Sequence, residues 1–246
     1  MSRIIDIVED IKTKLKQKAP QLTDSQKSRM YSILNSDNPN FEGYGNKISE
    51  IEKIIKSIHV KYQFSYVDAL EIFKSLIKSN VHDEKFAGVF LLNRFKGNFN
   101  EDTISIFHDA LNEHADTWAI VDSTCIRVIG PYLSKNDDLA KSTIEEWSEA
   151  ENMWIRRASL VILLKTIMVK KQFHEKNVFA FVHKMLNYSE DYIHKGIGWL
   201  LKTCSKYEPE IIINYLNKNK KILPRLILRY ASEKLPKETR AKILKK

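Results

Sequence analysis

Apolar residues recur along this chain at the three- and four-residue spacing of amphipathic helices, almost from one end to the other. Polar caps and glycines divide the pattern into segments, and no alternation of the β type persists for more than a few residues. The pattern predicts roughly fourteen helices. For two of them the sequence indicates only a start, at residues 24 and 101. The others are expected over residues 4–15, 48–58, 66–79, 84–96, 118–130, 137–149, 153–170, 175–187, 190–205, 209–219, 224–234 and 237–245.

The repeat length indicates how these helices are arranged. One helix pair occupies about 35 to 40 residues, which is typical of HEAT-like repeats whose pairs bury their apolar faces by stacking. We therefore expect an all-α protein, an α-solenoid of degenerate HEAT-like helix pairs with a concave face, as a single domain over residues 1–246. An irregular helical bundle is the alternative. Residues 38–46, rich in Gly, Asn and Pro, are expected to form a loop.

Composition narrows the class further. The chain has only 7 Gly and 6 Pro among 246 residues, which argues against a turn-rich β fold. It has neither an apolar run long enough to span a bilayer nor the apolar core of a signal peptide, so a cytoplasmic protein is expected, nucleoid-associated when bound to DNA. Cys125 and Cys204 fall in separate predicted helices and are expected to be buried free thiols.

Positive charge is concentrated in the C-terminal part. Residues 152–246 hold 21 Lys and Arg against 7 Asp and Glu, a net charge of +14, whereas residues 1–151 carry −5. A polyanion such as nucleic acid is the usual partner of such a region. A solvated lysine-rich surface is the alternative.

Asp122 is the most unusual carboxylate of the chain. It lies in the middle of a predicted helix, where Asp has poor propensity and no cap to form, and Trp118 lies one turn before it on the same face. A structural ion pair with Arg127, Arg156 or Arg157 is one explanation. The other is a carboxylate kept ionised near a developing cation or a water molecule, with Trp118 as an exposed aromatic wall rather than a core residue.

Two further segments combine aromatic and basic residues. Arg156 and Arg157 open a strongly apolar helix, and because adjacent residues point about 100° apart, at most one can face Asp122. Gly196 and Gly198 lie inside another predicted helix beside Trp199, where they indicate either close helix packing or space cleared next to that indole.

Common enzymatic signatures are absent. The chain has no GxGxxG, P-loop, HExxH or GxSxG motif, and its seven histidines show no spacing of metal ligands. We expect neither a metal nor another cofactor.

Three segments in this order resemble one known family: Trp118-Ala-Ile-Val-Asp122, Trp154-Ile-Arg-Arg157 and Lys195-Gly-Ile-Gly-Trp199. Together with the tail around residues 226–231, they resemble the DNA alkylation repair family of HEAT-like glycosylases, the AlkD-like proteins. The resemblance covers about residues 20–235. Gly196, where the family more often has Ala, and Lys202, where it often has Arg, depart from its pattern. The resemblance also implies that the concave face of the solenoid is basic and binds DNA.

The resemblance implies a monofunctional alkylpurine DNA glycosylase that excises positively charged N3- or N7-alkylated purines from double-stranded DNA. Asp122 would stabilise the oxocarbenium-like sugar cation, Trp118 and Trp199 would pack against the deoxyribose, and Arg157 would hold a phosphate near the lesion. Further DNA contacts are expected from basic residues of the same helices, namely Arg156, Lys165, Lys195 and Lys202. For Arg156, a purely structural role is the alternative to a DNA contact.

This chemistry suits the absence of other catalytic motifs. An alkylated purine already carries positive charge and leaves readily, so one carboxylate that stabilises the sugar cation suffices. The alternatives are a non-catalytic HEAT-repeat module that binds DNA or RNA and a protein scaffold for an acidic partner. A monomer is expected, and Trp118 and Trp199 are predicted to approach each other.

Overall fold

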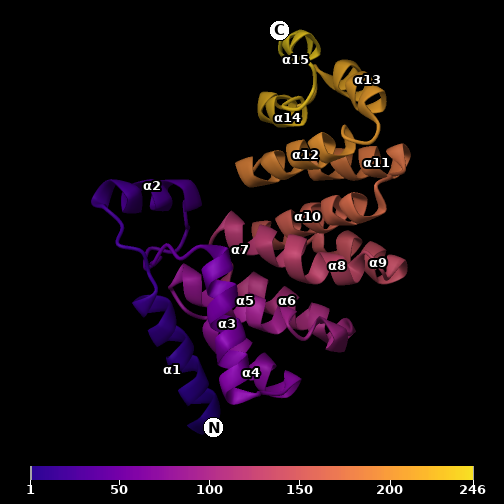
Figure 1. The fold of residues 1–246 in the computed structure, drawn as a ribbon. Helices are drawn as coiled ribbons and strands as arrows, with labels where there is room; N and C mark the ends of the chain where they lie inside the picture. The colour runs from indigo at the N-terminus through magenta and orange to yellow at the C-terminus, as the bar shows by residue number, and fades with distance from the viewer. Residues whose placement is uncertain (1, 246) are drawn as a thin grey trace. The chain divides into compact units, whose positions relative to one another are not determined.

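The structure is a computed structural model that describes residues 2–245, drawn in Figure 1. Its contacts divide the chain into two compact units, Met1–Val128 and Ile129–Lys246. Apart from one isolated bridge between Glu42 and Val81, the regular structure of the described residues is helical. The all-α class is therefore confirmed, while a single domain over residues 1–246 stays a prediction.

The first unit is built around one helix that is buried on every side. This helix is α5 (His82–Asn93), and each of its residues from His82 to Leu92 is buried. It packs on the neighbouring helices of the unit, as expected for a helix without an exposed face. The other helices of the unit are α1 (Ser2–Gln17), α2 (Asp24–Leu34), α3 (Ile48–Tyr62), α4 (Tyr66–Leu76), η1 (Lys96–Asn98), α6 (Glu101–His114) and α7 (Trp118–Ser123).

Charged groups in the first turn of α5 are buried and bind the 38–46 loop. The Asp83 carboxylate accepts hydrogen bonds from the backbone N–H groups of Tyr44 (2.9 Å) and Asn46 (2.8 Å). Glu84 accepts from the Tyr44 hydroxyl at 3.2 Å and from the Ser79 hydroxyl at 2.7 Å. Burial and the Glu84 charge raise the pKa of Tyr44 to about 12, so this hydroxyl stays a donor. The loop is therefore present, as predicted, and is held by carboxylates placed at a helix N-terminus.

His82 gives the first unit a predicted sensitivity to acid. Its ring lies between those of Phe41 and Phe86, and burial, with a smaller effect of the Lys85 charge, lowers its pKa to about 4. Between pH 6.5 and 4 the unfolded chain then binds a proton that the folded chain does not, so stability falls as the pH falls through this window.

Between pH 7 and pH 5 the contribution of His82 to the loss of unfolding free energy is about 2 kcal/mol. We expect His82→Gln to lack this component. Urea denaturation of both proteins at the two pH values measures it, and equal losses in both would contradict the assignment.

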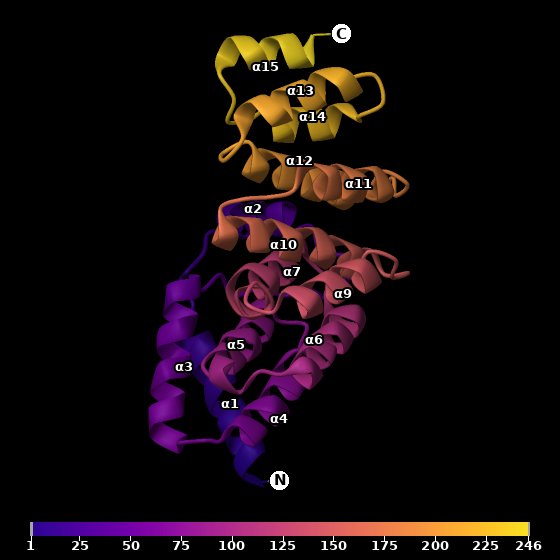
Figure 2. The ribbon, with the colours of Figure 1, turned by 90° about the vertical axis from the view of Figure 1, so that its right-hand side faces the viewer.

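The second unit consists of helix pairs stacked along one direction (Figure 2). Helix α10 packs on α12, and α12 packs on α14. Helices α9, α11 and α13 precede these in the chain and pack beside them. The unit comprises α8 (Gly130–Leu133), α9 (Asp137–Trp147), α10 (Met153–Lys170), α11 (Glu175–Met185), α12 (Asp191–Cys204), α13 (Pro209–Asn219), α14 (Arg225–Ala231) and α15 (Lys237–Leu244).

Each of the fourteen predicted helices is found among the described residues. Helices α4, α5 and α14 end three residues earlier than expected, and the end of one further helix was wrong in kind. The helix with Trp118 was expected to end at Gly130-Pro131, whereas the helical backbone continues from α7 through a π-helical segment, η2 (Thr124–Ile129), into α8. Pro131 falls in the first turn of α8, where its missing N–H is tolerated. The boundary between the units lies within η2.

Two smaller predictions are confirmed. Cys125 and Cys204 are buried free thiols, and burial raises the pKa of Cys204 to about 12, which makes it a poor nucleophile. Across residues 2–245, no helix combines the length and the hydropathy needed to cross a membrane.

Candidate active site

Helix α7 presents Trp118 and Asp122 one turn apart. Thr117 caps the helix, with its hydroxyl accepting from the N–H of Ile120, so Trp118 is the first helical residue. The Trp118 indole is half-buried and donates its Nε1–H to the carbonyl of Ile33 at 3.0 Å. Trp118 is therefore neither a core residue nor a freely rotating surface side chain.

Asp122 is almost fully buried. It is 8% exposed and follows three buried apolar residues of α7. One of its proposed ion-pair partners is engaged elsewhere, because Arg127 is exposed, pairs with Glu52 at 3.1 Å and lies over the Phe90 ring. The η2 segment begins two residues after Asp122. π-Helical turns occur often at functional sites, but the sequence did not indicate this one, because Gly130-Pro131 predicted a helix end.

Arg156 is held by its own unit. Its guanidinium pairs with Glu190, donates to the carbonyls of Ala150 (2.7 Å) and Glu151 (2.6 Å), and lies 4.3 Å from the centre of the Tyr188 ring. The residue is 6% exposed. These contacts favour a structural role for Arg156. A direct contact of Arg156 with DNA stays a prediction, and these contacts do not support it.

Arg157 is buried in a different environment. Its Nη1 donates to the carbonyl of Tyr192 at 2.6 Å, and its guanidinium lies 5.9 Å from the centre of that ring. Trp154 packs on the same ring, with centroids 5.0 Å apart. Tyr192, in the first turn of α12, therefore contacts both Trp154 and Arg157 at the start of α10, a role that the sequence did not indicate.

Helix α12 carries the second tryptophan beside two glycines. Trp199 is partly exposed, whereas Gly196 and Gly198 are buried. A Cβ atom at Gly198 would clash with the Cβ of Tyr230 on α14, and one at Gly196 would lie 2.9 Å from Cδ1 of Leu160 on α10. Close packing of α12 against α10 and α14 therefore accounts for both glycines.

The three predicted lysines are partly buried. Lys195 lies 5.0 Å from the centre of the Tyr192 ring, and Lys165 is half-buried on α10. Lys202 pairs with Glu233 at 3.0 Å, and this bond lowers the pKa of that carboxyl. Lys202 must therefore share its charge between Glu233 and any phosphate.

The candidate residues thus fall into two groups. Trp118 and Asp122 share α7 of the first unit. The second unit holds the others, on α10 and α12: Arg156, Arg157, Lys165, Lys195, Trp199 and Lys202. The second unit also holds most of the positive charge, with 23 Lys and Arg against 13 Asp and Glu over residues 129–246. Within the described part of the chain, no group of His, Cys, Asp and Glu has the arrangement of a metal site.

The comparisons with known proteins identify the class. The model of the DNA alkylation repair enzyme family matches residues 11–235, so the chain belongs to that family. DNA is the partner that this family implies.

A solved structure described as a predicted DNA alkylation repair enzyme from Enterococcus faecalis has a similar fold. It is 18% identical, and the match covers 88% of this chain and 98% of that chain with a TM-score of 0.74. At this identity the likeness establishes the fold alone. No curated protein matches the chain.

Proposed function

We propose that the protein is a monofunctional DNA glycosylase that hydrolyses the N-glycosidic bond of positively charged N3- or N7-alkylated purines in duplex DNA. The observation that carries the proposal is Asp122, a buried carboxylate one helical turn after a partly exposed tryptophan, in a chain of the DNA alkylation repair enzyme family. The protein acts as a monomeric α-solenoid whose concave basic face holds DNA inside the cell.

The chemistry requires stabilisation of positive charge on the sugar. The bond between C1′ and the purine nitrogen breaks, and its electron pair neutralises the cationic base. The sugar then resembles an oxocarbenium ion, which a carboxylate in a site of low polarity stabilises strongly. A water molecule positioned by Asp122 bonds to C1′ and gives up a proton to solvent.

The remaining residues bind and orient the DNA. Trp118 and Trp199 keep part of their surface exposed, as packing against the deoxyribose requires. Arg157 holds the phosphate at the lesion through the planar guanidinium geometry that suits phosphate oxygens. Lys165, Lys195 and Lys202 bind flanking phosphates, and Arg156 supports the start of α10.

Release of bases from methylated duplex DNA tests the proposal. We expect the wild-type protein to liberate N3-methyladenine and N7-methylguanine, identified by chromatography and mass, and to leave unmodified bases in place. A protein that binds the duplex but releases no alkylated base would instead be a non-catalytic DNA-binding module. A protein that fails to bind the duplex would favour a scaffold for an acidic protein partner.

A further inference from the structure

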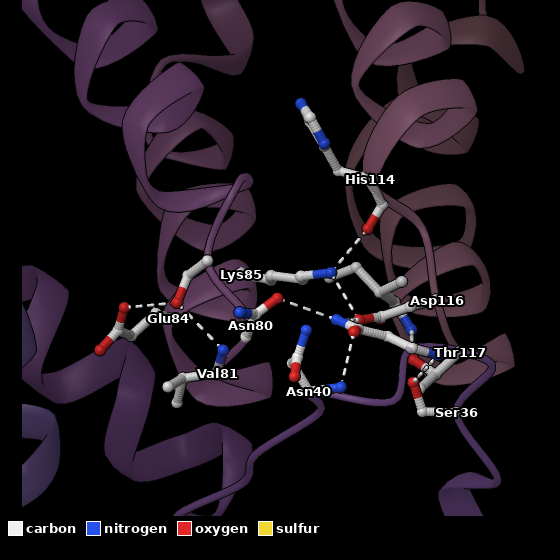
Figure 3. Close-up of polar contacts among 12 residues, drawn as sticks. Ser36, Asn40, Asn80, Val81, Glu84, Lys85, His114, Asp116 and Thr117 are labelled. Atoms are coloured by element: carbon white, nitrogen blue, oxygen red, sulfur yellow. Dashed lines mark hydrogen bonds and ion pairs between the residues drawn. The ribbon is translucent and has the colours of Figure 1, made fainter.

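A buried ion pair in the first unit lies outside the residues assigned to the reaction. Lys85, in the first turn of α5, is 3% exposed, and Asp116, just before α7, is 5% exposed. The Lys85 Nζ atom lies 2.6 Å from Oδ2 of Asp116 and donates a second bond of 2.6 Å to the carbonyl of His114 (Figure 3). Both charges are therefore removed from water. The Lys85 ammonium has two acceptors, whereas Asp116 uses Oδ2 alone and its Oδ1 atom is buried without a hydrogen-bond partner among the described residues.

Stability alone gives a weak reason for such a pair. Removing two charges from water costs several kcal/mol per ion, and well-packed apolar residues in their place often do as well. Because its hydrogen bonds are directional, the pair instead fixes the orientation of the Lys85 and Asp116 side chains relative to each other. Asp116 lies two residues before Trp118 and adjoins the capping residue Thr117, so the pair defines where α7 begins.

Asp116 also binds the segment that follows α2. Its backbone carbonyl accepts from the N–H of Asp37 at 3.2 Å, and its Oδ2 accepts from the Asn38 amide at 3.4 Å. Asn38 in turn donates to Asn80 at 2.9 Å, just before α5. Figure 3 shows this segment beside Lys85 and Asp116. Asp116 thus connects three parts of the unit: the start of α5, the start of α7 and the segment that follows α2.

Helix α2 has no buried residue, so its position relies on a few contacts at its surface. One of them is the edge-on packing of Tyr31 on Phe41, with centroids 5.5 Å apart, and the segment bound by Asp116 supplies others. The α2 carbonyl at Ile33 accepts the indole N–H of Trp118.

These contacts form a closed circuit. Lys85 binds Asp116, Asp116 binds Asp37 and Asn38, and the chain leads from these residues back to the end of α2. There the Ile33 carbonyl binds Trp118, two residues after Asp116. The circuit connects the Trp118 indole to the buried ion pair both along the chain and through the Ile33 carbonyl.

We propose that Lys85 and Asp116 are a positioning pair that fixes the Trp118 indole beside Asp122 through α2. This inference rests on the proposed function, since Trp118 is the ring assigned to the lesion's deoxyribose. Neither Lys85 nor Asp116 touches the reacting atoms. Loss of the pair therefore changes the excision step while DNA affinity stays the same.

The test measures Trp118 directly as well as excision. Lys85→Met keeps an unbranched side chain without the charge, and Lys85→Met/Asp116→Leu removes both charges, so that no buried ion is left unpaired. Lys61→Met is the matched control, because Lys61 pairs with Asp10 at 2.7 Å in the same unit without contacting α7. Each protein is labelled with 5-fluorotryptophan, and Trp118→Phe assigns the Trp118 fluorine resonance.

We expect the Trp118 resonance to move in both Lys85 variants and to stay in place in Lys61→Met. The single-turnover rate of base excision falls roughly 10- to 100-fold in both Lys85 variants, as displaced contacts at a reacting centre do, while the Kd for duplex DNA changes less than about twofold. The double variant regains thermal stability relative to Lys85→Met but not the excision rate. This separation distinguishes positioning from a structural role.

Two results would overturn the inference. One is an unmoved Trp118 resonance in both Lys85 variants. The other is a double variant in which stability, resonance and excision rate all return to wild-type values. A wild-type protein that releases no base would overturn the proposed function instead, and the fluorine resonance would still decide whether the pair orients Trp118.

Discussion

Replacing Asp122 with Asn is expected to lower the rate of base excision from methylated duplex DNA by about 10²- to 10³-fold, the usual cost of removing one electrostatic stabiliser of a transition state. Asn has the shape of Asp but no charge, so it cannot stabilise an oxocarbenium-like sugar. The DNA affinity should stay near the wild-type value, because the carboxylate contributes no attraction to phosphate. Single-turnover excision and a binding titration measure the two quantities separately.

The control for Asp122→Asn is Asp109→Asn. Asp109 lies on α6 of the same unit with its carboxylate exposed, 3.1 Å from Nδ1 of the His108 ring. This variant removes the same charge from the unit and should excise at the wild-type rate. Full activity in Asp122→Asn would remove Asp122 from the mechanism, and equal losses in both variants would indicate a general effect of charge.

The second large effect is expected at Gly198, where Ala should destabilise the second unit by about 1 to 3 kcal/mol. The added methyl group would meet the Cβ of Tyr230 and lie 3.3 Å from the carbonyl oxygen of Ile227. Neither atom can move independently of the α14 backbone. The steric clash can therefore be relieved only if α12 and α14 move apart. Urea denaturation measures the loss.

Gly196→Ala is the matched comparison on the same helix. Its methyl group would lie 2.9 Å from Cδ1 of Leu160, the flexible end of that side chain, and at ordinary contact distance from Leu160 Cβ (3.6 Å) and Arg157 Nη1 (3.7 Å). Ala is favoured over Gly inside helices by about 1 kcal/mol, so this variant should be neutral or more stable than the wild type. Equal destabilisation by the two substitutions would contradict the packing explanation and would favour a role of Gly198 beside Trp199.

Local patterns accounted for most of the helices. The stripe in α3 predicted its buried face, where Ile51, Ile54, Ile55 and Ile58 are all buried, because residues three and four apart share one side of a helix whatever lies opposite. Resemblance to a family then selected Asp122 and Trp118 from the many residues of this all-helical chain. The helix end at Gly130-Pro131 failed because nothing in the sequence distinguishes a π-helical turn that leads into proline from a helix end.

Contacts between distant segments were not predictable. The acidic first turn of α5 suggests an exposed helix start, yet the partners of Asp83 and Lys85 come from residues 44–46 and 114–116. Similarly, spacing alone could not separate the adjacent arginines. Glu190 and two carbonyl groups occupy Arg156, while Arg157 turns to Tyr192. The approach of Trp118 to Trp199 stays a prediction.

The bond from Trp118 to α2 has a consequence for how this protein can vary. The acceptor is the backbone carbonyl of Ile33, which every residue type supplies, and the Ile33 side chain is 55% exposed. Substitutions at such surface positions usually change stability by less than about 0.5 kcal/mol. Sequence drift along α2 can therefore alter the surface next to the tryptophan at little cost to folding.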